Sequence, residues 1–143
     1  MEKAFLGNDL EICRILNGMW QVAGGHGQID SELAIQDMEK YQELGFTTWD
    51  LADIYGPAES LIGEFSKKTK QKFQAFTKFV PNPGPMSNSI VTHYIDESLK
   101  KMNVDCIDLL QFHWWDYQDS SYLDALQHLS KLQNEGKIKH LGL

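Results

Sequence analysis

Apolar residues along this chain change their spacing in a regular way, and the changes predict strands and helices in alternation. Five short stretches are rich in strand-forming residues or alternate between apolar and polar positions, and four longer stretches have helical spacing. The predicted strands lie within residues 12–23, 46–52, 73–80, 104–112 and 138–143. The predicted helices run from a cap at Asp30 or Ser31 to Gly45, from Pro57 to Lys68, from a cap at Ser87 or Ser89 to Met102, and from Tyr122 to Gly136.

Each predicted helix carries an apolar stripe that would pack on a sheet. The stripes are Ala34, Met38 and Tyr41; Leu61, Ile62 and Phe65; Val91, Ile95, Leu99 and Met102; and Tyr122, Leu126, Leu129 and Leu132. The pair Asn17-Gly18 is compatible with a hairpin turn and also with a strand whose backbone a ligand can approach. The predicted loop 24–27 has part of a dinucleotide fingerprint, but Asp30 stands where the third glycine belongs, so a Rossmann fold is not predicted.

Strict alternation of strands and helices predicts right-handed βαβ units and a parallel sheet. Two α/β folds fit: a flavodoxin-like open sheet, and part of a (β/α)8 barrel of the TIM-barrel type. Barrel enzymes build their sites at the carboxyl ends of strands. The polar residues of interest lie at four such ends: 18–20, Asp50 with Tyr55, Lys78 and His113. The pattern therefore favours a barrel, truncated to about its first five strands and four helices.

Composition narrows the function classes. The chain has 143 residues, of which 42% are apolar, and this suits one domain. A net charge of −7 disfavours nucleic acid as a partner, because binding to it depends on basic residues that neutralise phosphates. No signal peptide and no run of transmembrane length are recognisable, so we expect no membrane association and a cytoplasmic location. Cys13 and Cys106 form no CxxC pair, which indicates neither a disulfide framework nor a metal site.

Asp50, Tyr55, Lys78 and His113 have the chemistry to deliver a proton to a carbonyl group. A tyrosine is a weak acid, and a nearby ammonium such as that of Lys78 stabilises its phenolate. Asp50 would supply the counter-charge that keeps the lysine protonated. The imidazole of His113 would orient the carbonyl and donate a hydrogen bond to its oxygen. None of the four supplies hydride, so the set implies a nicotinamide cofactor.

Other polar and aromatic residues have plainer interpretations. Gln111 shares a strand face with His113 and is predicted to be a polar group inside the barrel that needs a hydrogen-bond partner. Trp49 and Trp115 are predicted to be packing residues. The histidines for which the sequence suggests no partner are His26, His93, His128 and His140.

Successive motifs along the chain resemble those of the aldo-keto reductases. They are Gly18-Met19-Trp20-Gln21, Trp49-Asp50-Leu51-Ala52 with Tyr55-Gly56, Phe76-Thr77-Lys78, Ser98-Leu99-Lys100-Lys101 with Val104-Asp105-Cys106-Ile107-Asp108-Leu109, Phe112-His113-Trp114, and Glu135-Gly136-Lys137-Ile138 with Gly142. The resemblance covers about the whole chain. It implies an NADP-dependent oxidoreductase that reduces aldehydes or ketones to alcohols.

The resemblance also assigns roles to residues. Tyr55 would be the general acid/base and proton donor, and His113 would orient the substrate. Lys78 and Asp50 would tune the tyrosine. Gly18, Met19 and Asp50 would lie on the cofactor side, and NADPH is implied more often than NADH. Trp20 and Trp114 match aromatic residues that line the carbonyl pocket.

The number of strands departs from the family pattern. A complete barrel has eight strands in roughly 250 residues, and the pattern here supplies five, so residues 1–143 are interpreted as a single partial domain. Two alternatives stay open. One is a truncated form without turnover. The other is a binding or regulatory subunit with the reductase fold, similar to the beta subunits of voltage-gated potassium channels. The first and fifth strands would be unpaired edges, so we also expect self-association through them.

Overall fold

A parallel sheet forms the centre of the molecule. In a computed structural model, which describes residues 1–25 and 27–143, this sheet has five strands in the order β3-β4-β5-β6-β7, each parallel to its neighbours. The strands are β3 (Asn17–Gly18), β4 (Thr48–Asp50), β5 (Gln74–Phe79), β6 (Ile107–Phe112) and β7 (Ile138–Gly142). Strands that follow one another in the chain are also neighbours in the sheet. This order excludes the flavodoxin-like alternative, whose strand order reverses at a switch point, and fits an arc of a barrel.

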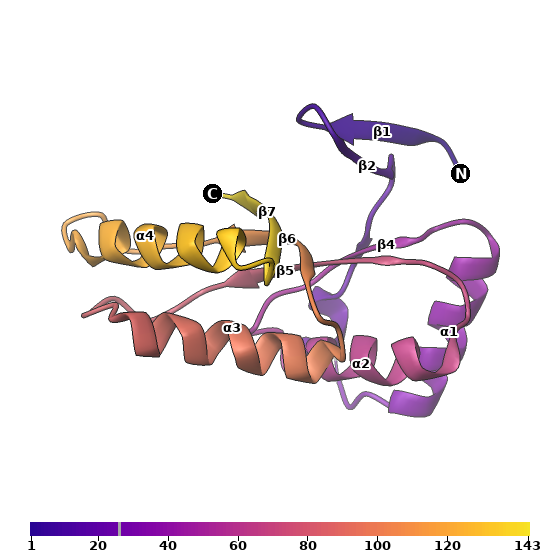
Figure 1. The fold of residues 1–143 in the computed structure, drawn as a ribbon. Helices are drawn as coiled ribbons and strands as arrows, with labels where there is room; N and C mark the ends of the chain where they lie inside the picture. The colour runs from indigo at the N-terminus through magenta and orange to yellow at the C-terminus, as the bar shows by residue number, and fades with distance from the viewer. Residues whose placement is uncertain (26) are drawn as a thin grey trace.

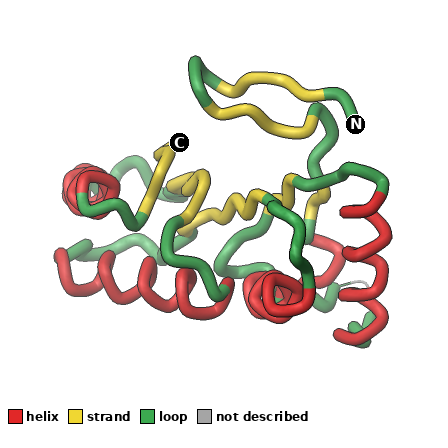
Figure 2. Tube along the Cα trace, turned by 45° about the vertical axis from the view of Figure 1, so that its right-hand side comes forward, coloured by secondary structure: helices red, strands yellow, loops and turns green. Residues whose placement is uncertain are grey.

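Helices connect the strands and cover one face of the sheet (Figures 1 and 2). They are α1 (Ser31–Glu43), α2 (Ala58–Lys68), α3 (Asn88–Met102) and α4 (Ser121–Asn134). Two of the predicted caps are present. The Asp30 carboxylate accepts hydrogen bonds from the first backbone amides of α1, and the Ser87 hydroxyl accepts one from the Ile90 amide. In the described part of the chain, no helix has both the length and the apolarity to cross a membrane.

The main core lies between the helices and the sheet, and the predicted stripes of α2, α3 and α4 face it. The stripe predicted for α1 is partly wrong, because Tyr41 is 49% exposed while Ile35 and Gln42 are buried. Gln42 faces inward since its side-chain amide donates to the backbone oxygen of Lys72 at 2.9 Å. A polar residue with a backbone partner thus occupies a core position, which hydrophobic spacing alone does not predict.

The opposite face of the sheet carries a hairpin of β1 (Lys3–Leu6) and β2 (Leu10–Cys13) (Figure 2). Leu10 and Ile12 of the hairpin pack against Phe76 and Leu109 of the sheet. The single strand expected within 12–23 is therefore wrong.

That stretch divides into β2, the two-residue β3 and a 3₁₀ helix, η1 (Trp20–Ala23). The Asn17 side chain donates to the backbone oxygens of Phe46 and Thr48 and so fixes β3 beside β4. Asn17-Gly18 is thus a strand and not a hairpin turn. Of the predicted loop 24–27, residue His26 lies outside the described residues.

Candidate active site

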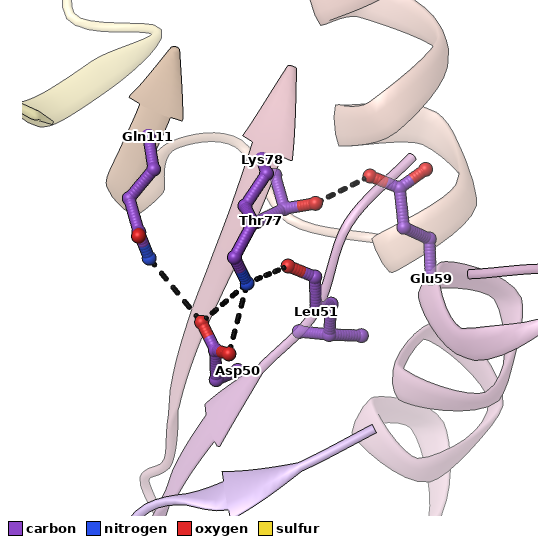
Figure 3. Close-up of polar contacts among 6 residues, drawn as sticks. All are labelled: Asp50, Leu51, Glu59, Thr77, Lys78 and Gln111. Carbon is purple, nitrogen blue, oxygen red and sulfur yellow. Dashed lines mark hydrogen bonds and ion pairs between the residues drawn. The ribbon is translucent and has the colours of Figure 1, made fainter. Parts of the chain in front are cut away.

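Polar side chains on one face of β4, β5 and β6 meet at the carboxyl ends of these strands. The strand register pairs Asp50 with Phe76 and Lys78 with Gln111. Because side chains alternate along a strand, Lys78 lies on the same face as Phe76 and hence as Asp50. Figure 3 shows Lys78 and Gln111 converging on the Asp50 carboxylate from two neighbouring strands.

The Lys78 ammonium is at the centre of these contacts. Its Nζ donates to both carboxylate oxygens of Asp50 and to the backbone oxygen of Leu51, each at 2.8 Å (Figure 3). The Lys78 side chain is only 16% exposed. Three acceptors match the three protons of an ammonium group, so the surroundings suit the charged lysine. The predicted pairing of Lys78 with Asp50 is present in the structure.

Gln111 completes the contacts of the Asp50 carboxylate. Its side-chain amide donates to Oδ1 of Asp50 at 3.2 Å. The sequence predicted that Gln111 needs a partner, and this partner is confirmed. A carboxylate held by an ammonium and an amide is fixed in position, which in turn fixes the ammonium.

Tyr55 lies in the turn between β4 and α2 and faces the Lys78 side chain. The Lys78 Nζ is 5.1 Å from the centre of the tyrosine ring. The ring of Trp20 packs edge-on against Tyr55 with ring centres 5.0 Å apart. Gly56 has a φ of +51°, and an added Cβ there would lie 3.1 Å from the backbone oxygen of Ala23, so the next residue after Tyr55 is restricted to glycine. The structure thus brings Asp50, Tyr55, Lys78 and Trp20 together.

His113 belongs to the other side of the site, after β6. It lines a cleft of about 510 Å³ together with Lys78, Gln111, Trp115 and Tyr117. The imidazole ring lies 4.3 Å, centre to centre, from the Trp115 ring at an angle of 31°. His113 therefore shares one cleft with the lysine, while its own ring packs on an exposed tryptophan.

The two tryptophans after β6 differ in exposure. Trp114, expected in the carbonyl pocket, is 4% exposed and packs in the core, and it also contributes to the lining of the His113 cleft. Its indole N–H donates to the backbone oxygens of Asp116 and Asp119, which holds the ring in the loop. Trp115, expected to be a packing residue, is 62% exposed beside His113. The alternation that predicts side-chain direction ends with the strand, so neither placement could be deduced from it.

Gly18 and Met19 adjoin the Asp50 end of the site. Gly18 pairs with Asp50 in the sheet, and a Cβ added to it would meet no heavy atom within 4 Å. The Met19 amide donates to the Asp50 backbone oxygen at 2.9 Å, and the Met19 side chain is buried in the core. This open backbone beside the Asp50 and Lys78 pair fits the approach of a flat ring such as a nicotinamide.

Two acidic residues that the sequence did not single out as site residues lie behind the site. Glu59, on the first turn of α2, is buried; it accepts a hydrogen bond from the Thr77 hydroxyl at 2.8 Å (Figure 3) and lies 3.6 Å from the Lys101 ammonium. The pKa of Asp53 is raised to about 6, mainly by burial and in part by the nearby Glu59, against the lowering effect of the Val80 amide. Burial of these acids depends on tertiary contacts and leaves no periodic signal in the sequence.

A second cleft, of about 720 Å³, lies between the hairpin and the open face of the sheet. His140 of β7 lines it, and its Nδ1 is 3.8 Å from the Asp9 carboxylate of the hairpin. The sequence suggested no partner for His140, and the structure places the Asp9 carboxylate near its ring. The contact with Asp9 was not predictable, because the hairpin that carries Asp9 was not predicted.

Known proteins resemble this chain in sequence over most of its length. Residues 14–143 match the family model described as the Aldo/keto reductase family. The chain is 33% identical over 131 residues to an aldo-keto reductase of Strobilurus tenacellus, covering 85% of this chain and 37% of that protein. It is 31% identical over an alignment of 164 positions to a 6-dehydroglucose reductase of Agrobacterium fabrum, and the alignment covers 100% of this chain and 53% of that protein.

Solved structures share the fold. An aldo-keto reductase from Bacillus halodurans superposes with a TM-score of 0.82 at 24% identity, covering 99% of this chain and 49% of that one. A thermostable aldo-keto reductase solved with the inhibitor epalrestat gives a TM-score of 0.84 at 23% identity, covering 99% of this chain and 53% of that one. The present chain thus spans about half the length of the barrels that it matches.

Proposed function

This chain belongs to the aldo-keto reductase family, and from that premise we propose that it functions in the NADPH-dependent reduction of aldehydes or ketones to alcohols, with Tyr55 as the proton donor. The observation that carries the proposal is the position of the Lys78 ammonium, 2.8 Å from both Asp50 oxygens and 5.1 Å from the centre of the Tyr55 ring. This geometry suits a phenol that must lose a proton.

The proton transfer follows from the charges. When a carbonyl carbon accepts hydride, negative charge develops on the carbonyl oxygen, and the Tyr55 phenol supplies a proton to that oxygen. The phenolate left behind is stabilised by the Lys78 ammonium. Asp50 and the backbone oxygen of Leu51 hold the ammonium in place, and Gln111 fixes the Asp50 carboxylate, so that no reorganisation is needed during the reaction.

The hydride would come from the nicotinamide of NADPH, with NADH as the less expected form. Gly18 and Met19 would lie against this cofactor beside Asp50, because the Gly18 backbone is open and exposed there. The location that we propose is a reducing compartment such as the cytoplasm, in line with the two free cysteines Cys13 and Cys106.

His113 would orient the carbonyl oxygen toward Tyr55 by a hydrogen bond, and the cleft that His113 shares with Lys78 would hold the substrate. Trp20, Trp115 and Tyr117 are exposed aromatic residues around this place. A relative that is 30% identical over 134 residues, from Saccharomyces cerevisiae, is named a probable aryl-alcohol dehydrogenase. The substrate class that we propose is therefore aromatic aldehydes, whose rings can stack on these side chains.

The test is the oxidation of NADPH with an aromatic aldehyde, followed at 340 nm for the chain, for Tyr55→Phe and for Tyr41→Phe. We expect turnover by the wild-type chain, a loss of about 10²- to 10⁴-fold in Tyr55→Phe because the general acid is removed, and no change in Tyr41→Phe. Turnover in Tyr55→Phe at the wild-type rate would contradict the proposal.

A wild-type chain without turnover would instead favour the second candidate function, a binding or regulatory subunit with the reductase fold. The observation behind this candidate is that β3 and β7 are the outer strands of the sheet, so self-association through them is also proposed. Binding of NADPH without oxidation, together with a dimer by analytical ultracentrifugation, is the result expected from that candidate.

A further inference from the structure

Asp53, two residues before Tyr55, joins the turn that carries the tyrosine to the strand end that carries the lysine. The Asp53 backbone amide donates to the backbone oxygen of Lys78 at 3.0 Å. The Asp53 carboxylate accepts from the backbone amide of Val80, with its two oxygens 3.1 and 3.3 Å away. A single residue of the turn therefore contacts the backbone on both sides of Phe79, immediately after Lys78.

The rest of the turn passes this connection on to Tyr55. The Tyr55 amide donates to the backbone oxygen of Ala52, and the Ala58 amide donates to the backbone oxygen of Tyr55, both at 3.0 Å. Tyr55 is thus held between Ala52, the residue before Asp53, and the first turn of α2. Movement of Asp53 relative to β5 would carry Tyr55 with it and change its distance from Lys78.

The Asp53 carboxylate is kept in surroundings that do not favour its charge. Burial raises its pKa to about 6, and Glu59 of α2 adds to this rise. Three groups act in the opposite direction: the Val80 amide just after β5, the Ile54 amide and the Lys101 ammonium of α3. A carboxylate retained in such a place beside a candidate site suggests a functional demand, because stability alone would favour a neutral residue.

We propose that Asp53 is a positioning residue, which fixes the Tyr55 phenol at its working distance from the Lys78 ammonium by anchoring the turn to the Val80 amide. The inference rests on the proposed function. It concerns the acceptor oxygen of Asp53 and assigns this side chain no contact with substrate or cofactor. Displacement of a reacting group by 1 Å can cost about 100-fold in rate, so the loss of the anchor affects kcat more than KM.

The experiment compares Asp53→Ala, Asp53→Asn and the matched surface control Asp37→Ala. Asp37 is exposed and forms an ion pair with Lys40. In Asp53→Ala we expect kcat to fall about ten- to hundredfold, with KM for aldehyde and NADPH within about twofold. Asp53→Asn keeps an acceptor for the Val80 amide and should recover most of the loss. A kcat of wild-type size in Asp53→Ala, or no recovery in Asp53→Asn, would overturn the inference.

A second readout needs no turnover. Hydrogen exchange at the Val80 and Tyr55 amides should be faster in Asp53→Ala than in the wild-type chain, Asp53→Asn and Asp37→Ala. Unchanged exchange in Asp53→Ala would overturn the anchoring even where the enzyme is active. If the wild-type chain does not oxidise NADPH but exchange in Asp53→Ala is faster as expected, the proposed function is contradicted and the anchoring role of Asp53 still stands.

Discussion

The two sides of the candidate site differ in how firmly they are held. On the β4 and β5 side, Asp50 and Lys78 form an ion pair whose side chains are 32% and 16% exposed, with Gln111 and Leu51 as further partners. On the β6 side, Trp115 is 62% exposed and the His113 ring packs on it. The side assigned to proton delivery is therefore preorganised, while the side assigned to the substrate is open. Under the proposed function, such a division lets one acid/base centre serve different carbonyl compounds.

The largest effect on the open side should come from His113→Ala. Loss of one donor to the developing oxyanion typically costs 10²–10³ in kcat, and we expect about a hundredfold fall in NADPH oxidation. Because His113 is exposed, the free energy of unfolding should change by less than about 0.5 kcal/mol in a urea titration. A large loss of stability would mean that the two sides are equally structural, and the contrast would fail.

A smaller effect is expected for Trp115→Ala. An aromatic pair contributes about 0.5–1.5 kcal/mol beyond its area, so KM for an aromatic aldehyde should rise about three- to tenfold. KM for a small aliphatic aldehyde should stay the same, since it has no ring to stack. The control is Tyr94→Ala, because Tyr94 is an exposed aromatic residue on α3 that lies outside this cleft. Equal changes with both aldehydes would remove Trp115 from the substrate side.

The smallest effect concerns stability and pH on the held side. The Asp53 carboxyl has a pKa of about 6 in the folded chain and an ordinary value of 3.8. Between these values the folded chain binds more protons than the unfolded one, so stability falls as pH rises from about 3.8 to 6 and is constant above. Asp53→Asn lacks this fall and should be more stable at pH 7 by about 1 kcal/mol, allowing for partial exposure.

Thermal unfolding of both proteins at pH 4 and pH 7 measures this difference. The melting temperatures should lie closer together at pH 4 than at pH 7. A larger difference at pH 4 would mean that the buried carboxylate stabilises the fold, and the functional explanation of its retention would lose its support.

Much of this picture was predictable from the sequence because period and register act locally. The order of strands and helices placed Asp50 and Lys78 at the carboxyl ends of neighbouring strands and indicated the barrel. Strand order then had to come from the structure, since the same alternation fits an open sheet. The Lys78 contact with Leu51 was also out of reach, because a backbone oxygen carries no residue-specific signal.

The failures have physical causes of their own. The hairpin of β1 and β2 is stabilised by long-range contacts of Leu10 and Ile12 with the sheet, and sequence periodicity reports only on neighbours along the chain. The burial of Trp114 and the exposure of Trp115 were not predictable, because side-chain direction is undetermined once a strand has ended. Asp53 was missed for a related reason: its partner, the Val80 amide, belongs to a distant segment.

The most direct test of the central claim is a double-mutant cycle of Tyr55→Phe, Lys78→Met and the double variant, measured as single-turnover NADPH oxidation with an aromatic aldehyde. Groups that act as one unit have strongly non-additive effects. The account predicts that each single variant loses about 10²- to 10⁴-fold and that the double variant loses little more than either one. Losses that multiply in the double variant would contradict it, because Tyr55 and Lys78 would then act independently.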